Sequence, residues 1–187
     1  YNCSSASAQT VRGLTDTTAT PALLADNITP NPQYALVAGG APIYSPNMAY
    51  ALYITVDGVI TIRGNDGSFR FQSSIYDDNG TTATPARSTV VPALQTAYIR
   101  MVSGNLVFTN FLGAAYFTTG FASTDAITSN FFALDDDGVA RVYKQTSSPT
   151  AAGTLPAGNF IGLASLTALW STDSVLLPGM RLYAWNS

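Results

Sequence analysis

Carboxylates and amides are the side chains of this sequence that could do chemistry. All eleven acidic residues are aspartates, and the chain has no histidine, no glutamate and a single lysine, Lys144. The histidine general base and the imidazole metal ligand are therefore excluded. Two aspartates held close together could run glycoside or aspartyl chemistry. The adjacent aspartates at 77–78 and 135–137 sit in predicted turns, where neighbouring side chains point apart, so we expect no catalysis.

The run Asp135, Asp136 and Asp137 also offers oxygen ligands of the type that Ca²⁺ takes. It lacks the spaced loop and the distal glutamate of an EF-hand. A solvated hairpin turn, with aspartates capping nearby N–H groups, accounts for the same run. We therefore predict no metal and no cofactor.

The elements that must position these side chains are predicted to be strands. Threonine, tyrosine, phenylalanine, valine and isoleucine are abundant and suit a pleated, half-buried surface, whereas glutamate and lysine, which favour solvated helices, are nearly absent. Residues 1–33 are Ser/Thr/Pro-bearing without periodicity and indicate an extended arm. Residues 34–187 indicate a single all-β domain, an antiparallel β-sandwich or barrel of about 10 short strands. Trp170 and Trp185 are expected to be core residues.

Three predicted hairpins resemble one another and turn at Asp57-Gly58, Ser103-Gly104 and Asp137-Gly138. In this respect the chain resembles the bulb-type mannose lectins, whose threefold β-prism carries one Gln-x-Asp-x-Asn-x-Val-x-Tyr motif per subdomain. Asp57 and Asp137 match the motif's Asp, Asn105 its Asn, Val107 its Val and Tyr143 its Tyr, and no repeat has the Gln. The resemblance implies glycan binding, with the candidate residues Asp57, Asn105, Asp137 and Tyr143.

The stretches YITVDGVITIRG and FALDDDGVARVY also resemble the β-rich domains of fungal-type secreted cell-wall and surface proteins. Those domains are rich in Ser, Thr and Ala and poor in His and Lys. This resemblance implies a wall, adhesin or matrix role and supplies no catalytic residue.

Three Asn-x-Ser/Thr sequons, at Asn2, Asn27 and Asn79, predict N-glycosylation and an extracellular or cell-surface location. The sequence opens at Tyr1, which is typical of a processed product, and no apolar run is long enough to span a bilayer. The lone cysteine, Cys3, either contacts a partner chain or is a free thiol on a tail.

Only 10% of the residues are charged, and the seven arginines are scattered singly, so we expect no nucleic-acid partner. Such a surface has little charge repulsion to keep copies apart. The main hypothesis is therefore an extracellular, glycosylated structural protein that self-associates as a wall, matrix or filament subunit. The alternative is a glycan-binding, lectin-type module. The expected partners are copies of the chain, N-linked glycans and polysaccharide.

Overall fold

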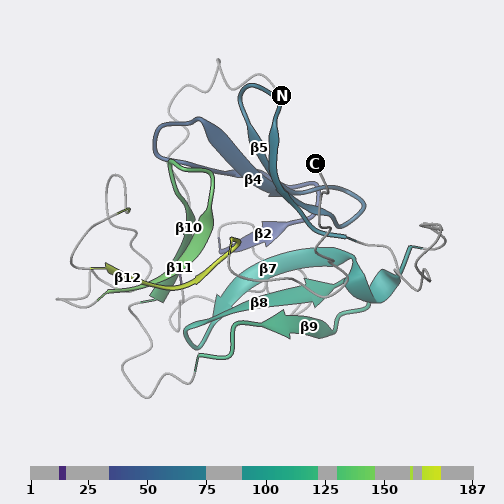
Figure 1. Ribbon diagram of the computed structural model, residues 1–187. Coiled ribbons are helices and arrows are strands. Elements are labelled where there is room, and N and C mark those ends of the chain that lie inside the picture. The colour runs from purple at the N-terminus through teal and green to yellow at the C-terminus, as the bar shows by residue number, and fades with distance from the viewer. Residues whose placement is uncertain are drawn as a thin grey trace, which may run out of the picture.

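The computed structural model describes residues 13–15, 34–74, 90–121, 130–145, 161 and 166–173. Within these ranges the chain forms twelve strands and one short 3-10 turn, η2 (Pro92–Leu94), and no α-helix (Figure 1). No helix in these ranges is long and apolar enough to cross a membrane. The prediction of an all-β, antiparallel fold is confirmed.

The strands form three four-stranded sheets, and every pairing within a sheet is antiparallel. The first sheet contains β3 (Ile43–Tyr44), β4 (Tyr50–Ile54), β5 (Ile60–Gly64) and β6 (Phe69–Gln72). The second contains β2 (Ala35–Val37), β7 (Thr96–Val102), β8 (Asn105–Asn110) and β9 (Ala115–Thr118). The third contains β1 (Leu14–Thr15), β10 (Asn130–Leu134), β11 (Ala140–Gln145) and β12 (Leu166–Ser171).

The three similar hairpins of the sequence become the central hairpins of the three sheets: β4–β5, β7–β8 and β10–β11. Their turn glycines, Gly58, Gly104 and Gly138, all have positive φ angles, of 84°, 77° and 79°. Glycine adopts this conformation without steric cost, so the recurring glycine fixes the same tight turn three times. The fold is therefore a threefold repetition of one sheet plan.

The inner faces of the three sheets meet in one hydrophobic core. Leu52 and Ile54 alternate with outward residues along β4, as a half-buried strand requires. Trp170 of the third sheet lies edge-on to Phe108 of the second, with ring centroids 6.5 Å apart, and is only 8% exposed. It is a core residue, as predicted. Trp185 lies outside the described residues.

The predicted N-terminal arm, residues 1–33, is described only at 13–15. There Leu14 pairs with Phe132 and Thr15 with Phe131 of the same chain, and Leu14 is fully buried. An apolar residue of the predicted arm thus completes the inner face of the third sheet within the same chain. The rest of the segment lies outside the described residues, so the division at residue 33 stays a prediction.

Candidate functional site

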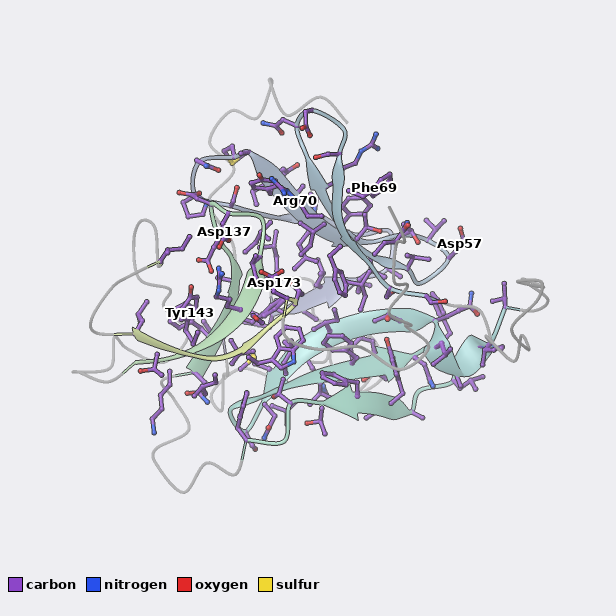
Figure 2. The ribbon with its side chains drawn as sticks, in the orientation of Figure 1. Asp57, Phe69, Arg70, Asp137, Tyr143 and Asp173 are labelled. Atoms are coloured by element: carbon purple, nitrogen blue, oxygen red, sulfur yellow. The ribbon has the colours of Figure 1, made fainter. Side chains whose placement is uncertain are left out.

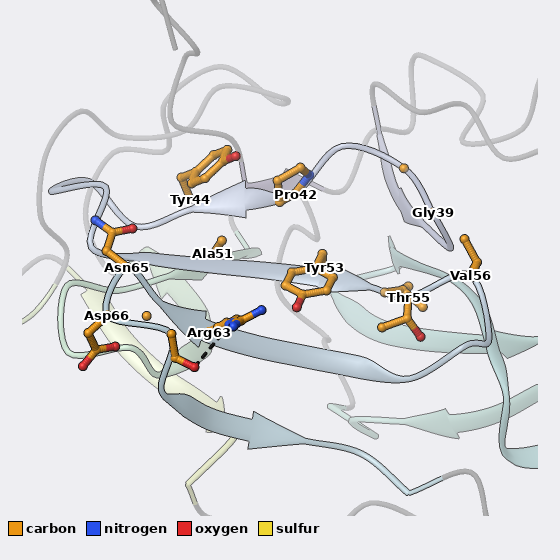
Figure 3. Close-up of a pocket in the computed structure, with 14 residues that line it drawn as sticks. Gly39, Pro42, Tyr44, Ala51, Tyr53, Thr55, Val56, Arg63, Asn65 and Asp66 are labelled. Atoms are coloured by element: carbon orange, nitrogen blue, oxygen red, sulfur yellow. Dashed lines mark hydrogen bonds between the residues drawn. The ribbon is translucent and has the colours of Figure 1, made fainter. Parts of the chain in front are cut away.

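A pocket of about 420 Å³ opens on the outer face of the first sheet (Figure 3). It exists because β4 alternates: Leu52 and Ile54 point into the core, so Ala51 and Tyr53 face outward and form the floor. The loop before β3, with Gly39, Gly40 and Pro42, supplies a wall. The volume falls within the range of small-molecule binding sites.

One end of the pocket is polar and is built by the β5–β6 turn. Arg63, Asn65 and Asp66 line it together with Gly64 and Gly67. The Arg63 guanidinium lies 5.3 Å from the centre of the Phe69 ring, and its Nε donates to the carbonyl of Gly67 at 3.2 Å. These contacts hold the guanidinium in place and leave its two terminal nitrogens without a hydrogen bond to the described residues.

Asp66 is fixed through one of its two carboxylate oxygens. Oδ1 accepts from the Ser68 hydroxyl at 2.6 Å and from the Ser68 backbone N–H at 2.9 Å. These hydrogen bonds hold the pKa of Asp66 below its usual value, so the group is ionised at neutral pH. Oδ2 has no partner among the described residues and remains an acceptor at the pocket.

Asn65 is anchored to the loop between β3 and β4. Its backbone N–H donates to the carbonyl of Ala49 and its Nδ2 to the carbonyl of Met48, both at 2.9 Å. Oδ1 has no partner within the described part of the chain. The end of β5 and the turn that follows it therefore present a fixed guanidinium, a fixed carboxylate and an amide oxygen at the polar end.

The other parts of the pocket are aromatic and apolar. Figure 3 shows Tyr44 and Pro42 above the strand that carries Tyr53, with Val56 at the end away from Asp66. Val56 is 74% exposed. Gly39 has φ +69°, and a Cβ there would lie 3.1 Å from the Val56 side chain, so a larger residue would crowd this end.

The positions in the second and third sheets that correspond to Arg63 are buried. Counted from the turn glycine, Arg63 corresponds to Thr109 in the second sheet and Tyr143 in the third. Thr109 and Tyr143 are buried, whereas Arg63 is exposed. Of the three equivalent positions, the one in the first sheet is thus open to a ligand.

In the third sheet, the corresponding space holds a network of charged groups. Arg141 donates through Nη1 to Asp135 at 2.6 Å and through Nη2 to Asp137 at 2.7 Å. The Tyr143 hydroxyl donates to the same Asp135 oxygen, Oδ2, at 2.6 Å. Figure 2 shows Asp137 and Tyr143 on this hairpin. Four side chains of the third sheet are therefore hydrogen-bonded to one another.

Burial and hydrogen bonds act in opposite directions on the pKa values of the two aspartates in this network. Asp135 is fully buried, which raises its pKa, although the hydrogen bonds from Tyr143 and Arg141 oppose the rise. Burial likewise raises the pKa of Tyr143. For Asp137 burial acts in the same direction, but hydrogen bonds from Arg141 and the Val139 N–H outweigh it and lower the pKa.

The residues predicted for glycan binding are spread over the three sheets. Asp57 is exposed in the β4–β5 turn and is not part of the pocket lining. Asn105 accepts from the Phe121 N–H at 2.6 Å and donates to the carbonyls of Ser103 and Phe121. Asp137 and Tyr143 belong to the Arg141 network. The structure does not bring the four together, and their role in binding stays a prediction.

Four other predicted site residues, Asn2, Asn27, Asn79 and Cys3, lie outside the described residues. Among the residues that are described, no group of three potential metal-ligating side chains occurs.

Sequence reasoning missed the pocket residues Tyr44, Tyr53, Arg63, Asn65 and Asp66. The run Asn65-Asp66-Gly67 has the residue types of an ordinary turn, and tyrosines are common in strands, so neither feature by itself indicates a pocket. One signal was present: Ala51, Tyr53 and Thr55 alternate with buried residues and must share one outer face. The opposite side of the pocket, formed by residues 39–44, could not be predicted from the alternation within β4.

No protein-family model matches the chain, and no curated protein matches its sequence. Among solved structures, the chain is similar to one described as Japanese Marasmius oreades lectin, with 16% sequence identity and a TM-score of 0.45. The alignment covers 74% of this chain and 84% of that one. The likeness concerns the β-rich fold alone.

Proposed function

We propose that the chain is a glycan-binding module and that the first-sheet pocket holds an uncharged sugar. The observation that carries the proposal is the pocket itself: two tyrosines, a fixed guanidinium and a carboxylate with an unused oxygen line one concave site. This is the alternative hypothesis from the sequence, now attached to a different set of residues.

The chemistry of the pocket suits hydroxyl groups. A sugar hydroxyl can donate to the ionised Asp66 and accept from Arg63, and the Asn65 carbonyl oxygen offers a further acceptor. Tyr44 and Tyr53 offer flat apolar faces against which a pyranose ring can lie. Arg63 and Asp66 lie at the same end of the pocket, so the carboxylate would repel an anionic sugar and the guanidinium would repel a cationic one. Neither group repels an uncharged sugar.

The proposal is for binding without catalysis, in an extracellular or cell-surface setting. Glycoside hydrolysis uses two carboxyl groups facing the bond that breaks. Asp66 is the single carboxylate among the described residues that line the pocket. The hypothesis of a structural wall, matrix or filament subunit has less in its favour, because it rests on surface composition rather than on a built site.

A glycan array followed by calorimetry tests the proposal with a matched pair of variants. Asp66→Asn removes the carboxylate from the pocket but keeps an oxygen that can accept from Ser68. Asp57→Asn makes the same change in the neighbouring turn, at a residue predicted from the lectin resemblance. We expect the first variant to bind the best array glycan at least about tenfold more weakly, because it loses a charge-assisted hydrogen bond.

The Asp57→Asn protein should bind like the unmodified chain. Loss of binding in that variant alone would place the sugar at the β4–β5 turn and not in the pocket. An array without any bound uncharged glycan would contradict the proposal altogether.

A further inference from the structure

Exposed apolar side chains gather at one end of the molecule. Six large hydrophobic residues are strongly exposed among the described residues, and four of them lie in segments that meet at this end: Val56 (74%), Val90 (41%), Phe111 (49%) and Leu112 (69%). Pro92 and Ala93 of η2 are exposed beside them. We call the set formed by Val56, Val90, Pro92, Ala93, Phe111 and Leu112 the apolar end.

Hydrogen bonds hold the three segments of the apolar end together. Gln95 is the centre: its Nε2 donates to the carbonyl of Asp57 at 2.9 Å, and its own carbonyl accepts from the Phe111 N–H at 3.2 Å. Asn110 donates to the carbonyl of Ala93 at 3.2 Å. The β4–β5 turn, η2 and the β8–β9 turn therefore form one preformed surface, on the right in Figure 1.

This surface is nearly free of charge. Arg100 is the one charged residue at positions 90–121, and it lies on β7 with its guanidinium 5.8 Å from the Tyr98 ring centre. Asp57, at the edge, is the one charged side chain of the β4–β5 turn (Figure 2). Interface centres are typically depleted of charge and enriched in aromatic residues, and large exposed apolar patches mark interaction sites.

The occupant that fits this surface is a second copy of the chain. In a two-fold contact each patch meets its own copy, so any charge at its centre would face the same charge. The chain carries a net charge of −3, and the apolar end is a surface where two copies can meet without like charges opposed. An anionic membrane would call for lysines or arginines at the rim, and the described segments 54–59, 90–99 and 108–116 contain none. We infer that two copies associate through the apolar end.

Sedimentation velocity over a micromolar concentration series tests the inference. Leu112→Asp places a charge within the apolar end, and Thr167→Asp places the same charge on an exposed position of β12 in the third sheet. The unmodified chain should shift from monomer to dimer mass as concentration rises. Leu112→Asp should weaken the dimer at least about tenfold, and Thr167→Asp should leave it unchanged.

Circular dichroism and thermal unfolding should show both variants folded, since each replaced side chain is exposed. A monomer at every concentration for the unmodified chain would overturn the inference, as would Leu112→Asp dimerising like the unmodified chain. A monomer that floats with uncharged phosphatidylcholine vesicles would assign the surface to lipid instead. The experiment needs no sugar, so its result is independent of glycan binding.

Discussion

Arg141 is the residue on which the third sheet's buried charges depend. It donates to two carboxylates, and one of them, Asp135, is fully buried, with no hydrogen-bond partner for its Oδ1 among the described residues. A buried carboxylate without its cation keeps the cost of desolvation and loses the compensating attraction. The network therefore contributes to stability only while it is complete.

Replacing this arginine should destabilise the fold. We expect Arg141→Met to lower the free energy of unfolding by about 3 kcal/mol, because Asp135 is then left buried without a cation. Arg70→Met is the control: Arg70 is exposed and donates to the Tyr50 hydroxyl, so its loss should leave the free energy of unfolding nearly unchanged. Urea unfolding followed by the fluorescence of Trp170 and Trp185 measures both. Equal midpoints for the two variants would refute the role given to Arg141.

The protonation of Asp66 predicts how sugar binding depends on pH. Its pKa is lowered by the Ser68 hydrogen bonds, so the carboxylate keeps its negative charge as the pH falls through the usual aspartate value of about 3.9. Affinity should stay level from neutral pH to about 4.5 and fall only below the usual value. Calorimetry across this range tests it, and a decline centred above pH 5 would show that another group controls binding.

At the scale of elements, the β10–β11 turn supports the first sheet. The Asn47 N–H donates to Asp136 Oδ1 at 2.8 Å, and Gly138 packs against the ring of Tyr50. Asn47 belongs to the loop that also anchors Asn65, so a turn of the third sheet helps to position the polar end of the pocket.

Two turn glycines allow this contact to be isolated. Gly138 and Gly113 both have positive φ angles, of 79° and 81°. A Cβ at Gly138 would lie 2.9 Å from the Tyr50 ring, whereas one at Gly113 would meet nothing within 4 Å. Both alanine variants carry the backbone strain, but Gly138→Ala should cost about 1–3 kcal/mol more, because the ring must move. Thermal unfolding compares them. Indistinguishable midpoints would mean that the turn does not depend on this contact.

The strands could largely be predicted from the sequence, whereas the pocket could not. Strand and turn chemistry is local, so the hairpins at Asp57-Gly58 and Asp137-Gly138 could be found from residue types alone. The pocket is not local: Tyr44 and Tyr53 meet Arg63 and Asp66 only because β3 pairs with β4 and β4 with β5. The resemblance pointed to glycan binding and to Asp137 and Tyr143, which in the structure belong to the Arg141 network.

At the scale of the whole molecule, strands from early in the sequence complete sheets whose other strands come much later. β1 joins β10, β11 and β12 in the third sheet, and β2 joins β7, β8 and β9 in the second. Leu14 is buried in the same cluster as Trp170 and Phe132. Closure of the core therefore needs residues that the sequence assigned to an arm.

Removing this strand should unfold the protein or weaken it severely. Leu14→Ala should cost about 2–5 kcal/mol, the range for a buried leucine, while Thr15→Ala should cost well under half of that. A chain beginning at residue 34 should melt at a lower temperature than the Leu14→Ala variant, because it loses the strand pairing as well. A truncated chain as stable as the full one would restore residues 1–33 to the role of a separate arm.

A crystal structure of the protein with the best glycan from the array would show whether the first-sheet pocket binds an uncharged sugar. We expect a sugar ring against Tyr53, with a hydroxyl group within hydrogen-bond distance of Asp66. A sugar found instead on the second or third sheet, at Asn105 or beside Tyr143, with the first-sheet pocket empty, would contradict it.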